Sequence, residues 1–576
     1  MNRAIDTEVL IVGAGPVGLT LAIDLAWRGV DVMVADLRRA GEPPSVKCNS
    51  ISARSMETFR RLGLAARLRA AGLPPDYPND VASRTTATGI ELCRIGIPSR
   101  AERYGANDGP DTLWPTSEPP HRVNQIYFEP ILFAHAAAQP RIRMLNRTAF
   151  EDFTQDGDSV MAVLRDLDDG ARLSIACSFL IGCDGGKSTV RKRIGASFLG
   201  TPVVQRVQST YIRAPALVSR LPGKRAWMYF SLNPRRCGTT IAIDGRETWL
   251  IHNFLYRDET EFDSVDRDWA IRTILGVGPD FEYEVIAKED WVGRRLVADS
   301  FRDRRVFLCG DAAHLWIPHG GYGMNAGIAD AANLSWMIAA TLAGWAPLAI
   351  LDAYEAERRP IADEMSRFTM DFALKIIKQR REISAEIELP GPVGDAARAR
   401  LGREAYELDV QQQCCGGLNF GYFYARSPII AYDGESHPAY TMYDFIPSTV
   451  PGCRAPHLWL NDHRSLYDAL GPDYTLVRID SSAHVSGIIE AAARRSLPLL
   501  VVDVDTSDAR SLYTRKLTLI RPDQHVAWRC DEEPASPLDL IDLVRGALAI
   551  PTESWDDQSH ANRSQTRRLT PRSTTI

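Results

Sequence analysis

One stretch near the start of the chain, "VLIVGAGPVGLTLAIDLAWRGVDVMVAD" at residues 9–36, constrains the fold most strongly. Its first residues form a continuous apolar run, which is typical of a parallel strand buried on both faces. A segment with helical periodicity follows the glycines and ends at Gly29, and a second apolar run ends at Asp36. The stretch therefore predicts the first strand, helix and second strand of a Rossmann-like α/β domain.

The turn between the first strand and the helix matches the pattern G-x-G-x-x-G. Its glycines let the backbone approach a pyrophosphate, and the start of the helix offers free N–H groups and a favourable dipole. The carboxylate at the end of the second strand can accept hydrogen bonds from ribose hydroxyls. The residues predicted to hold the dinucleotide here are Gly13, Gly15, Pro16, Val17, Gly18, Asp36, Leu37 and Arg38.

A second stretch, "LCGDAAHLWIPHGGYGMNAGIADAANLSW" at residues 308–336, indicates that the dinucleotide carries a flavin. An apolar run stops on an aspartate, and a buried carboxylate without a partner is costly, so it should meet a polyol such as the ribityl chain. The glycine-rich turn leaves room for a flat ring, and N–H groups at the start of the next helix would face its pyrimidine edge. The residues predicted to bind here are Gly310, Asp311, Pro318, Gly321, Gly323, Met324 and Asn325.

The bulk composition narrows the class of protein and its partners. The net charge of −6 is too small to favour nucleic acid or an anionic membrane as a partner, and 45% hydrophobic residues is ordinary for a globular chain. The apolar run at the start of the chain is short and turns into glycines, unlike a signal peptide, and no run of 18 apolar residues predicts a membrane span. The spacings of the 10 cysteines suggest neither disulfides nor a metal site. We therefore expect a cytoplasmic enzyme without a bound metal.

Short alternating stretches such as "TTIAIDG" and "TWLIHNFLY" predict an antiparallel sheet that interrupts the first domain. We assign residues 1–385 to a flavin-binding domain (about 1–79, 111–199 and 290–385) interleaved with a substrate domain (about 80–110 and 200–289). After it we expect a linker and wrapping segment at 386–450, an α/β domain at 451–550 and a disordered polar tail at 551–576.

With a third motif, "CDGGKSTVR" at residues 183–191, the chain resembles the single-component FAD-dependent aromatic hydroxylases, which share the p-hydroxybenzoate hydroxylase fold. The stretch "GCRAPHLWL…SLYDALG…LTLIRPDQHVAWR" resembles the thioredoxin-like domain of the phenol hydroxylase branch, but it lacks the C-x-x-C needed for thiol–disulfide chemistry. The resemblance implies that Asp184 contributes to flavin and nicotinamide binding. It also implies that Gln125 contacts the cofactor, that Arg54 lies near the pyrophosphate, and that the protein is a homodimer.

The resemblance also implies a reaction. NADPH or NADH would bind transiently, since no second G-x-G-x-x-G follows a strand, and would reduce FAD. O₂ would then give a flavin C4a-hydroperoxide whose distal oxygen hydroxylates a phenolic or related aromatic substrate. The protein would have to exclude water from this species and favour the ionised phenol.

Four residues are candidates for contact with the substrate. His319 stands beside the predicted ring, while Tyr229 and His252 lie on predicted substrate-domain strands, where both are common as core residues. Asn49 stands where relatives have Asp or His, and an amide can orient a phenolic hydroxyl without acting as a base. Two arginine pairs, Arg235–Arg236 and Arg294–Arg295, suit an acidic substrate, although such pairs usually form solvated surface.

Two alternatives stay open at this point. The same chemistry serves tailoring oxygenases that hydroxylate, epoxidise or carry out Baeyer–Villiger insertion on polyketide-type or other natural products. From a different class, the chain could be a non-catalytic flavin-binding protein. A halogenase or a disulfide reductase is less compatible, because W-x-W-x-I-P and C-x₄-C near the first helix are both absent.

Overall fold

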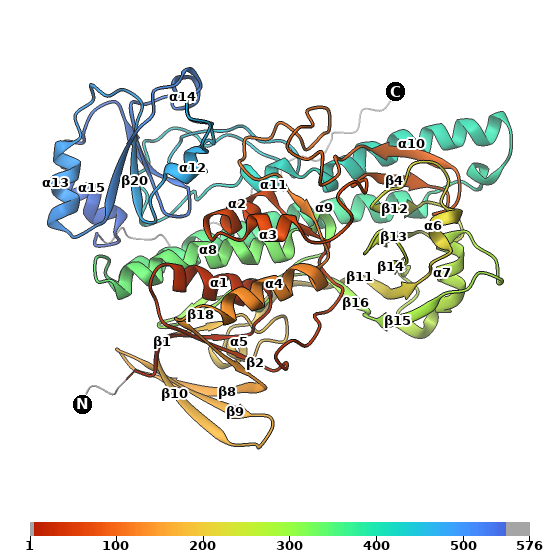
Figure 1. Ribbon diagram of the computed structural model, residues 1–576, viewed down its shortest axis with the longest axis horizontal. Coiled ribbons are helices and arrows are strands. Elements are labelled where there is room, and N and C mark those ends of the chain that lie inside the picture. Colours follow the sequence, from red (N-terminus) through yellow and green to blue (C-terminus); the bar gives the residue numbers. More distant parts are fainter. Residues whose placement is uncertain (1–4, 549–576) are drawn as a thin grey trace, which may run out of the picture.

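The computed structural model describes residues 5–548 (Figure 1). The predicted disordered tail at 551–576 lies outside these residues. Within residues 5–548, no helix combines the length and the apolar character needed to cross a membrane.

The first sheet has eight strands, six of which lie in the order β17-β18-β10-β1-β2-β7. Strand β1 pairs in parallel with β2 and β10, and β10 pairs in parallel with β18, as the continuous apolar runs predict. The hairpin β8–β9 extends the sheet beyond β10. These strands are β1 (Thr7–Val12), β2 (Val32–Asp36), β7 (Ile142–Asn146), β8 (Thr148–Gln155), β9 (Val160–Asp166), β10 (Arg172–Gly182), β17 (Arg302–Asp303) and β18 (Val306–Leu308).

Helices α1 (Pro16–Trp27), α4 (Gln125–Ala137) and α8 (Gly323–Leu342) lie together on one side of this sheet (Figure 1). Helix α1 begins with a proline at its first position, where the missing N–H removes no helical hydrogen bond. It packs against both α4 and α8. The start of α8, and with it the flavin motif, is therefore held beside the start of α1.

The second sheet has nine strands, eight of which lie in the order β19-β16-β11-β14-β13-β12-β4-β5. Its neighbours are antiparallel except for β4 and β12, so the sheet is mixed rather than purely antiparallel as we expected. Strand β19 belongs to the flavin motif, which is thus hydrogen-bonded into the substrate sheet. The strands are β4 (Val81–Arg84), β5 (Glu91–Ile95), β11 (Phe198–Arg213), β12 (Met228–Ser231), β13 (Gly238–Ala242), β14 (Thr248–Phe254), β15 (Glu284–Lys288), β16 (Trp291–Ala298) and β19 (His314–Leu315).

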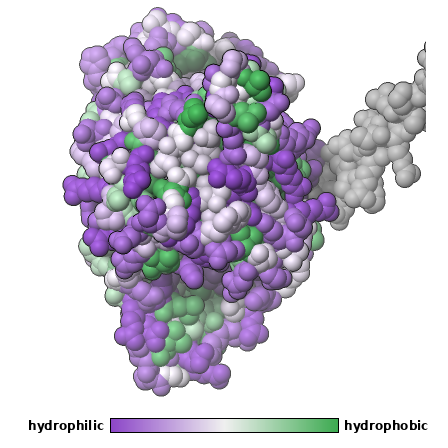
Figure 2. Space-filling model, turned by 90° about the vertical axis from the view of Figure 1, so that its right-hand side faces the viewer, coloured by the Kyte–Doolittle hydropathy of each residue, from purple (hydrophilic) through white to green (hydrophobic). Residues whose placement is uncertain are grey.

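The end of the molecule that carries the substrate sheet has a mostly hydrophilic surface, and its hydrophobic residues form small, separate patches (Figure 2). The larger exposed hydrophobic side chains of this domain include Trp269, Val285 and Ile286. Scattered residues of this kind are normal on a soluble surface and mark no extended apolar contact area.

Two long helices, α9 (Asp352–Arg381) and α10 (Pro392–Gln413), follow α8, and α10 packs against β4 and β5 of the substrate sheet. Helix α10 corrects our expectation of an irregular segment at 386–450. Its proline stands at the first helical position, and the glycines around it lie at its ends or contact neighbouring backbone. The residues from the end of α10 to 450 are mostly irregular, with the short helix α11 (Gly416–Phe420).

The C-terminal domain contains a four-stranded sheet in the order β21-β20-β22-β23. Strand β20 is parallel to β21 and antiparallel to β22, so a βαβ unit is followed by a hairpin and a final helix, as expected of a thioredoxin-like domain. Its elements are α12 (Leu466–Ala469), β20 (Tyr474–Arg478), α13 (Ser486–Arg494), β21 (Leu499–Asp503), α14 (Ser507–Leu512), β22 (Leu517–Ile520), β23 (Val526–Cys530) and α15 (Pro537–Val544).

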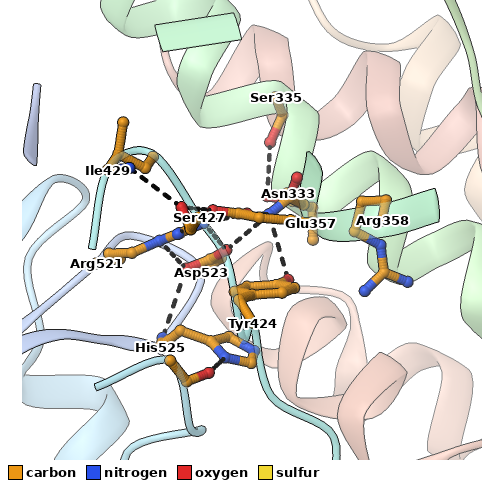
Figure 3. Close-up of polar contacts among 12 residues, drawn as sticks. Asn333, Ser335, Glu357, Arg358, Tyr424, Ser427, Ile429, Arg521, Asp523 and His525 are labelled. Carbon is orange, nitrogen blue, oxygen red and sulfur yellow. Dashed lines mark hydrogen bonds and ion pairs between the residues drawn. The ribbon is translucent and has the colours of Figure 1, made fainter. Parts of the chain in front are cut away.

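A buried polar network joins this domain to α8 and α9 (Figure 3). Arg521 donates hydrogen bonds to both carboxylate oxygens of Glu357 on α9, and the longer of the two measures 2.8 Å. It also donates to Asp523 at 2.8 Å. Asn333 on α8 donates to Glu357 at 2.7 Å and to Asp523 at 3.0 Å. The C-terminal domain is therefore tied directly to the helices that carry the flavin motif.

The remaining helices and strands are short. They are β3 (Ser50–Ile51), α2 (Ala53–Arg61), α3 (Ala65–Arg69), β6 (His121–Arg122), α5 (Thr189–Arg193), α6 (Leu217–Arg220) and α7 (Arg267–Leu275), with 3-10 turns η1 (Phe262–Ser264), η2 (Gly310–Ala312), η3 (His319–Gly321), η4 (Leu348–Leu351) and η5 (Ala385–Glu388).

Candidate active site

The three sequence motifs meet at one edge of the first sheet. Each follows the carboxyl end of a strand, and the strands β1, β10 and β18 are adjacent and parallel. The Cys183 N–H donates to the Val12 carbonyl at 2.8 Å, and the Cys309 N–H donates to the Gly182 carbonyl at 2.9 Å. This is the edge at which open α/β sheets bind their ligands.

The glycine turn combines tight packing with open space. Gly13 has φ of +107°, and a methyl group added to it would lie 2.4 Å from the Cys183 carbonyl oxygen. One added to Gly18 would lie 1.9 Å from the Gly13 carbonyl oxygen. A methyl group on Gly15 or on Gly323 would instead meet no atom within 4 Å, so these two glycines border the space that a dinucleotide would fill.

The end of β2 is fixed by a chain of polar contacts. Asp36 accepts hydrogen bonds from the Ala14 N–H at 2.6 Å and the Arg38 N–H at 2.8 Å. The Arg38 guanidinium reaches Glu129 on α4 at 2.6 Å, and the second oxygen of Glu129 accepts from Gln125 at 2.6 Å. Asp36, Arg38 and Gln125 thus share one network, and its central Glu129 is a residue that the sequence pattern did not reveal.

Asp311 has the surroundings of a ligand-binding carboxylate. Burial raises the pKa of its carboxyl group, while the nearby His314 and Lys47 lower it. The residue is nonetheless exposed, and it accepts no hydrogen bond within residues 5–548. A carboxylate that is enclosed by protein but open to space on one side fits the predicted polyol partner. Lys47 is a second residue that we did not anticipate at this position.

The side chain of Asn325 fixes the turn before α8 through hydrogen bonds. Asn325 accepts hydrogen bonds from the Ser52 N–H at 2.9 Å and the Ser55 hydroxyl at 2.8 Å, and it donates to the Gly321 carbonyl at 2.8 Å. Its side chain therefore positions the turn rather than facing a ligand. The first helical N–H groups, including that of Met324, have no partner among the described residues and suit the edge of a flavin ring.

The middle motif joins the other two. One oxygen of Asp184 accepts from the Thr189 N–H at 2.7 Å and so caps α5, while its other oxygen is buried without a partner. Arg191 donates to the carbonyls of Gly186 and Ala312, both at 3.0 Å. Because this second oxygen is buried, the contact between Asp184 and the cofactor that the resemblance implies stays a prediction.

Three of the remaining cofactor residues differ in their surroundings. Leu37 is 60% exposed and Pro318 is also exposed, so both border open space. The Arg54 side chain instead donates to Glu57 at 2.8 Å and to the Asp523 carbonyl at 3.2 Å. The expectation that Arg54 lies near the pyrophosphate is therefore wrong, because α2 presents it to the C-terminal domain.

A buried polar triad supports the flavin motif. Asp330 on α8 contacts His314 at 2.7 Å, accepts from Arg358 at 2.8 Å and accepts from the Gly310 N–H at 3.1 Å. Burial alone would raise the pKa of Asp330, but His314 and Arg358 lower it to about 2. The carboxylate thus stays charged and fixes the turn that carries Asp311.

A second set of polar residues, called the His319 group below, lies where the flavin turn faces the substrate sheet and α10. His319 contacts Gln412 at 3.1 Å, and Gln412 donates to Asp409 at 2.9 Å. Burial and Arg380 lower the pKa of His319 and of His252 to about 4, so both rings are neutral at pH 7. Burial raises the pKa of Asp409 to about 6. The sequence had revealed the two histidines but not Asp409, Gln412 or Arg380.

Two predicted catalytic residues do not face this group. The Tyr229 hydroxyl accepts from the Ala226 N–H at 2.7 Å inside the substrate domain. Its neighbour Phe230 lies under Arg380 instead, because alternate residues of a strand point to opposite faces. Asn49 accepts from Asn124 at 2.6 Å and donates to the Lys47 carbonyl, so both ends of its amide are already used. Both predictions need this correction.

The described residues include no group of three or more His, Cys, Asp and Glu side chains able to hold a metal ion. The cradle at the sheet edge has the glycine clearances, the helix N-termini and the unpaired carboxylate that a bound FAD requires. The residues present therefore fit this cofactor.

Comparison with known families decides the class. The family described as FAD binding domain matches residues 6–369, and the family described as aromatic-ring hydroxylase, C-terminal, matches residues 448–549. The chain belongs to the FAD-dependent aromatic-ring hydroxylases. This aromatic-ring hydroxylase uses FAD, and NAD(P)H is implied by its family. The alternative of a non-catalytic flavin-binding protein is set aside.

Three similar proteins each cover more than four fifths of the hydroxylase. FAD-dependent monooxygenase opdD of Penicillium oxalicum is 30% identical over 83% of this chain and 94% of its own length. Phenol 2-monooxygenase of a Pseudomonas species is 26% identical over 96% of this chain and 94% of its own length. The rebeccamycin biosynthetic enzyme RebC with reduced flavin superposes with a TM-score of 0.85 at 34% identity, over 95% of this chain and 100% of RebC.

Proposed function

We propose that the enzyme uses NAD(P)H and O₂ to hydroxylate a phenolic or related aromatic substrate. One observation carries this proposal. The flavin motif is hydrogen-bonded into the substrate sheet through β19 and β16, so the cofactor cradle and the group around His319 share one turn. A substrate held by that group would lie against the ring end of the cofactor.

The cofactor would supply the activated oxygen atom, and the chain's own residues would prepare both reactants. Asp311 would hold the polyol, and the N–H groups at the start of α8 would stabilise negative charge on the ring. Asp184 would contribute to cofactor binding. His319 and His252, both neutral, would line the substrate side.

The substrate must also lose a proton to react readily. A phenol of pKa ~10 is only about one part in a thousand ionised at pH 7, a deficit of roughly 4 kcal/mol. Asp409 is held by the Ser83 hydroxyl at 2.9 Å and by Gln412, and its pKa of about 6 suits a proton acceptor near neutral pH. The positive charge of Arg380 nearby would stabilise the phenolate.

A screen of phenolic compounds for stimulated NAD(P)H oxidation tests the proposal, with mass spectrometry of the products. We expect at least one phenol to accelerate NAD(P)H consumption and to gain one oxygen atom. Stimulated oxidation that yields only H₂O₂, or no stimulation by any aromatic compound, would contradict it.

Natural-product tailoring is the second candidate function, and it includes epoxidation and Baeyer–Villiger insertion. The similarity to RebC, a biosynthetic enzyme for rebeccamycin, favours it. The same assay with polycyclic aromatic and polyketide-type compounds separates the two candidates, because NMR of the product shows which bond received the oxygen. The homodimer also stays a prediction, which light scattering of the holoenzyme would test.

A further inference from the structure

Arg380 is buried without a carboxylate partner. It stands near the end of α9 and is 6% exposed, yet it forms no ion pair within residues 5–548, and one terminal nitrogen of its guanidinium is buried with no hydrogen-bond partner. It lies over the ring of Phe254 at 4.0 Å and that of Phe230 at 5.8 Å. Aromatic faces and the helix C-terminus attract a cation, but they do not accept its hydrogen bonds. Since arginine does not lose its proton in proteins, its donors need an acceptor.

A surface pocket of about 500 Å³ opens onto Arg380. Its walls include Tyr256, Arg257, Asp258, Arg381 and Ile383. Three arginines against one aspartate give the pocket a positive charge. Arg257 and Arg381 are exposed and form no ion pair among the described residues, so no protein carboxylate neutralises them. The volume is within the range of pockets that bind small molecules.

The same guanidinium acts on the interior. Its charge lowers the pKa of both His252 and His319, after burial, and it also acts on Asp409. On the outer side, the pocket residue Tyr256 acts to raise the pKa of Arg380, although burial lowers it overall. Arg380 therefore stands between the surface pocket and the group that faces the flavin turn.

Three of the four arginines that suited an acidic substrate in the sequence are already paired with carboxylates, whereas Arg294 is half-buried and forms no ion pair among the described residues. Arg235 pairs with Glu388 at 2.8 Å, Arg236 pairs with Glu259 at 2.7 Å, and Arg295 pairs with Asp363. Arg380, which no motif marked, combines a guanidinium nitrogen that is buried without a partner with a place in the wall of the pocket.

We propose that the pocket around Arg380 is an anion subsite that binds a carboxylate of the aromatic substrate. The inference rests on the proposed function, and it narrows the substrate class to aromatic acids. For its ring to reach the flavin side, the acid would have to extend past the Arg380 guanidinium toward His252 and His319, which do not line the pocket. Bidentate contact between guanidinium and carboxylate would supply both affinity and orientation.

Calorimetric titration of the FAD-loaded protein with 2-naphthoate and with 2-naphthamide tests the proposal, because the two probes differ in charge but hardly in shape. We expect the wild-type protein to bind the acid at least tenfold more tightly than the amide. Arg380→Met should reduce this preference to within twofold. Lys378→Met removes an exposed charge from the same helix and should keep the preference.

Equal binding of acid and amide by the wild-type protein, or binding of neither, would overturn the proposal. So would a preference that survives Arg380→Met or is lost in Lys378→Met. Competition between NADPH and 2-naphthoate would also overturn it, because the anion would then be a phosphate of the nicotinamide cofactor. If Arg380→Met does not fold, a structure with 6-bromo-2-naphthoate decides, since its carboxylate must lie against Arg380.

These titrations measure binding without turnover, so they can fail independently of the proposed function. Acid preference in a protein that hydroxylates no aromatic compound would leave the anion subsite standing and remove the hydroxylation proposal. Hydroxylation of phenols by a protein that does not prefer the acid would leave the hydroxylation proposal standing and remove the anion subsite.

Discussion

Two arginines are buried to a similar degree, but their surroundings differ. Arg521 is 1% exposed and donates to two carboxylates, those of Glu357 and Asp523, which also accept from Asn333 (Figure 3). Arg380 is 6% exposed, lies over the rings of Phe254 and Phe230, lines a positively charged pocket and forms no ion pair within residues 5–548. The first arginine completes a structural joint between domains. The second has a guanidinium nitrogen that is buried without a hydrogen-bond acceptor, which is typical of a ligand-binding group.

Removing the satisfied arginine should have the largest effect. Arg521→Met leaves Glu357 and Asp523 buried without their cation, and breaking a buried ion pair in this way costs about 3–5 kcal/mol. Urea unfolding of the holoenzyme measures the loss. Arg515→Met removes an exposed pair with Asp531 and should cost less than about 1 kcal/mol. Equal losses in the two variants would contradict the structural role of Arg521.

Asp311 extends the comparison to a carboxylate without a partner. Asp311→Ala should leave the stability of the FAD-free protein unchanged or slightly higher, because it removes an unpaired enclosed charge. FAD binding should weaken by about 10–100-fold, the equivalent of about 1.5–3 kcal/mol for a hydrogen bond to a charged group. Fluorescence titration of the apoprotein with FAD measures this. An unchanged affinity would separate Asp311 from the cofactor.

Asp409 should give the protein a pH-dependent stability. Burial raises its pKa from 3.8 to about 6, so it stabilises the fold when protonated. This contribution is complete below pH 3.8 and is lost as the pH rises through about 6. Between pH 5 and 7.5 the wild-type protein should lose roughly 1–2 kcal/mol that Asp409→Asn does not lose. Urea unfolding of both proteins at pH 5 and at pH 7.5 gives the change in unfolding free energy with pH. The same change in the wild-type protein and in Asp409→Asn would rule out the raised pKa.

Removing the unpaired arginine should have the smallest effect on stability. Arg380→Met deletes a buried charge without leaving a carboxylate behind, so unfolding free energy should change by less than about 1 kcal/mol or increase. Thermal unfolding of the holoenzyme checks this, with Arg380→Lys as the variant that keeps the charge. A loss as large as that of Arg521→Met would mean that Arg380 has a structural partner.

Local patterns were sufficient to locate the motifs that meet at one edge of the first sheet. The Gly13–Gly18 turn and Asp311 were recognisable because each follows directly on a buried strand, and strands that are parallel and adjacent bring their ends together. The same logic failed for Arg54, because a helix can present a side chain to either of two neighbours and the sequence does not say which. It failed for Tyr229 because the sequence shows that alternate side chains of a strand point to opposite faces of the sheet, but it does not show which face meets the flavin.

The sequence by itself determined the cofactor motifs, because each depends on contacts within a short segment of fixed geometry, and those motifs carried the resemblance that implied the class of enzyme. Only the tertiary structure decided which charged side chains are satisfied. Arg521 finds Glu357 across 164 positions of the chain, and Asp409 reaches Ser83 across 326. Hydrogen-bond satisfaction over such separations depends on how whole elements pack, and no local pattern encodes it.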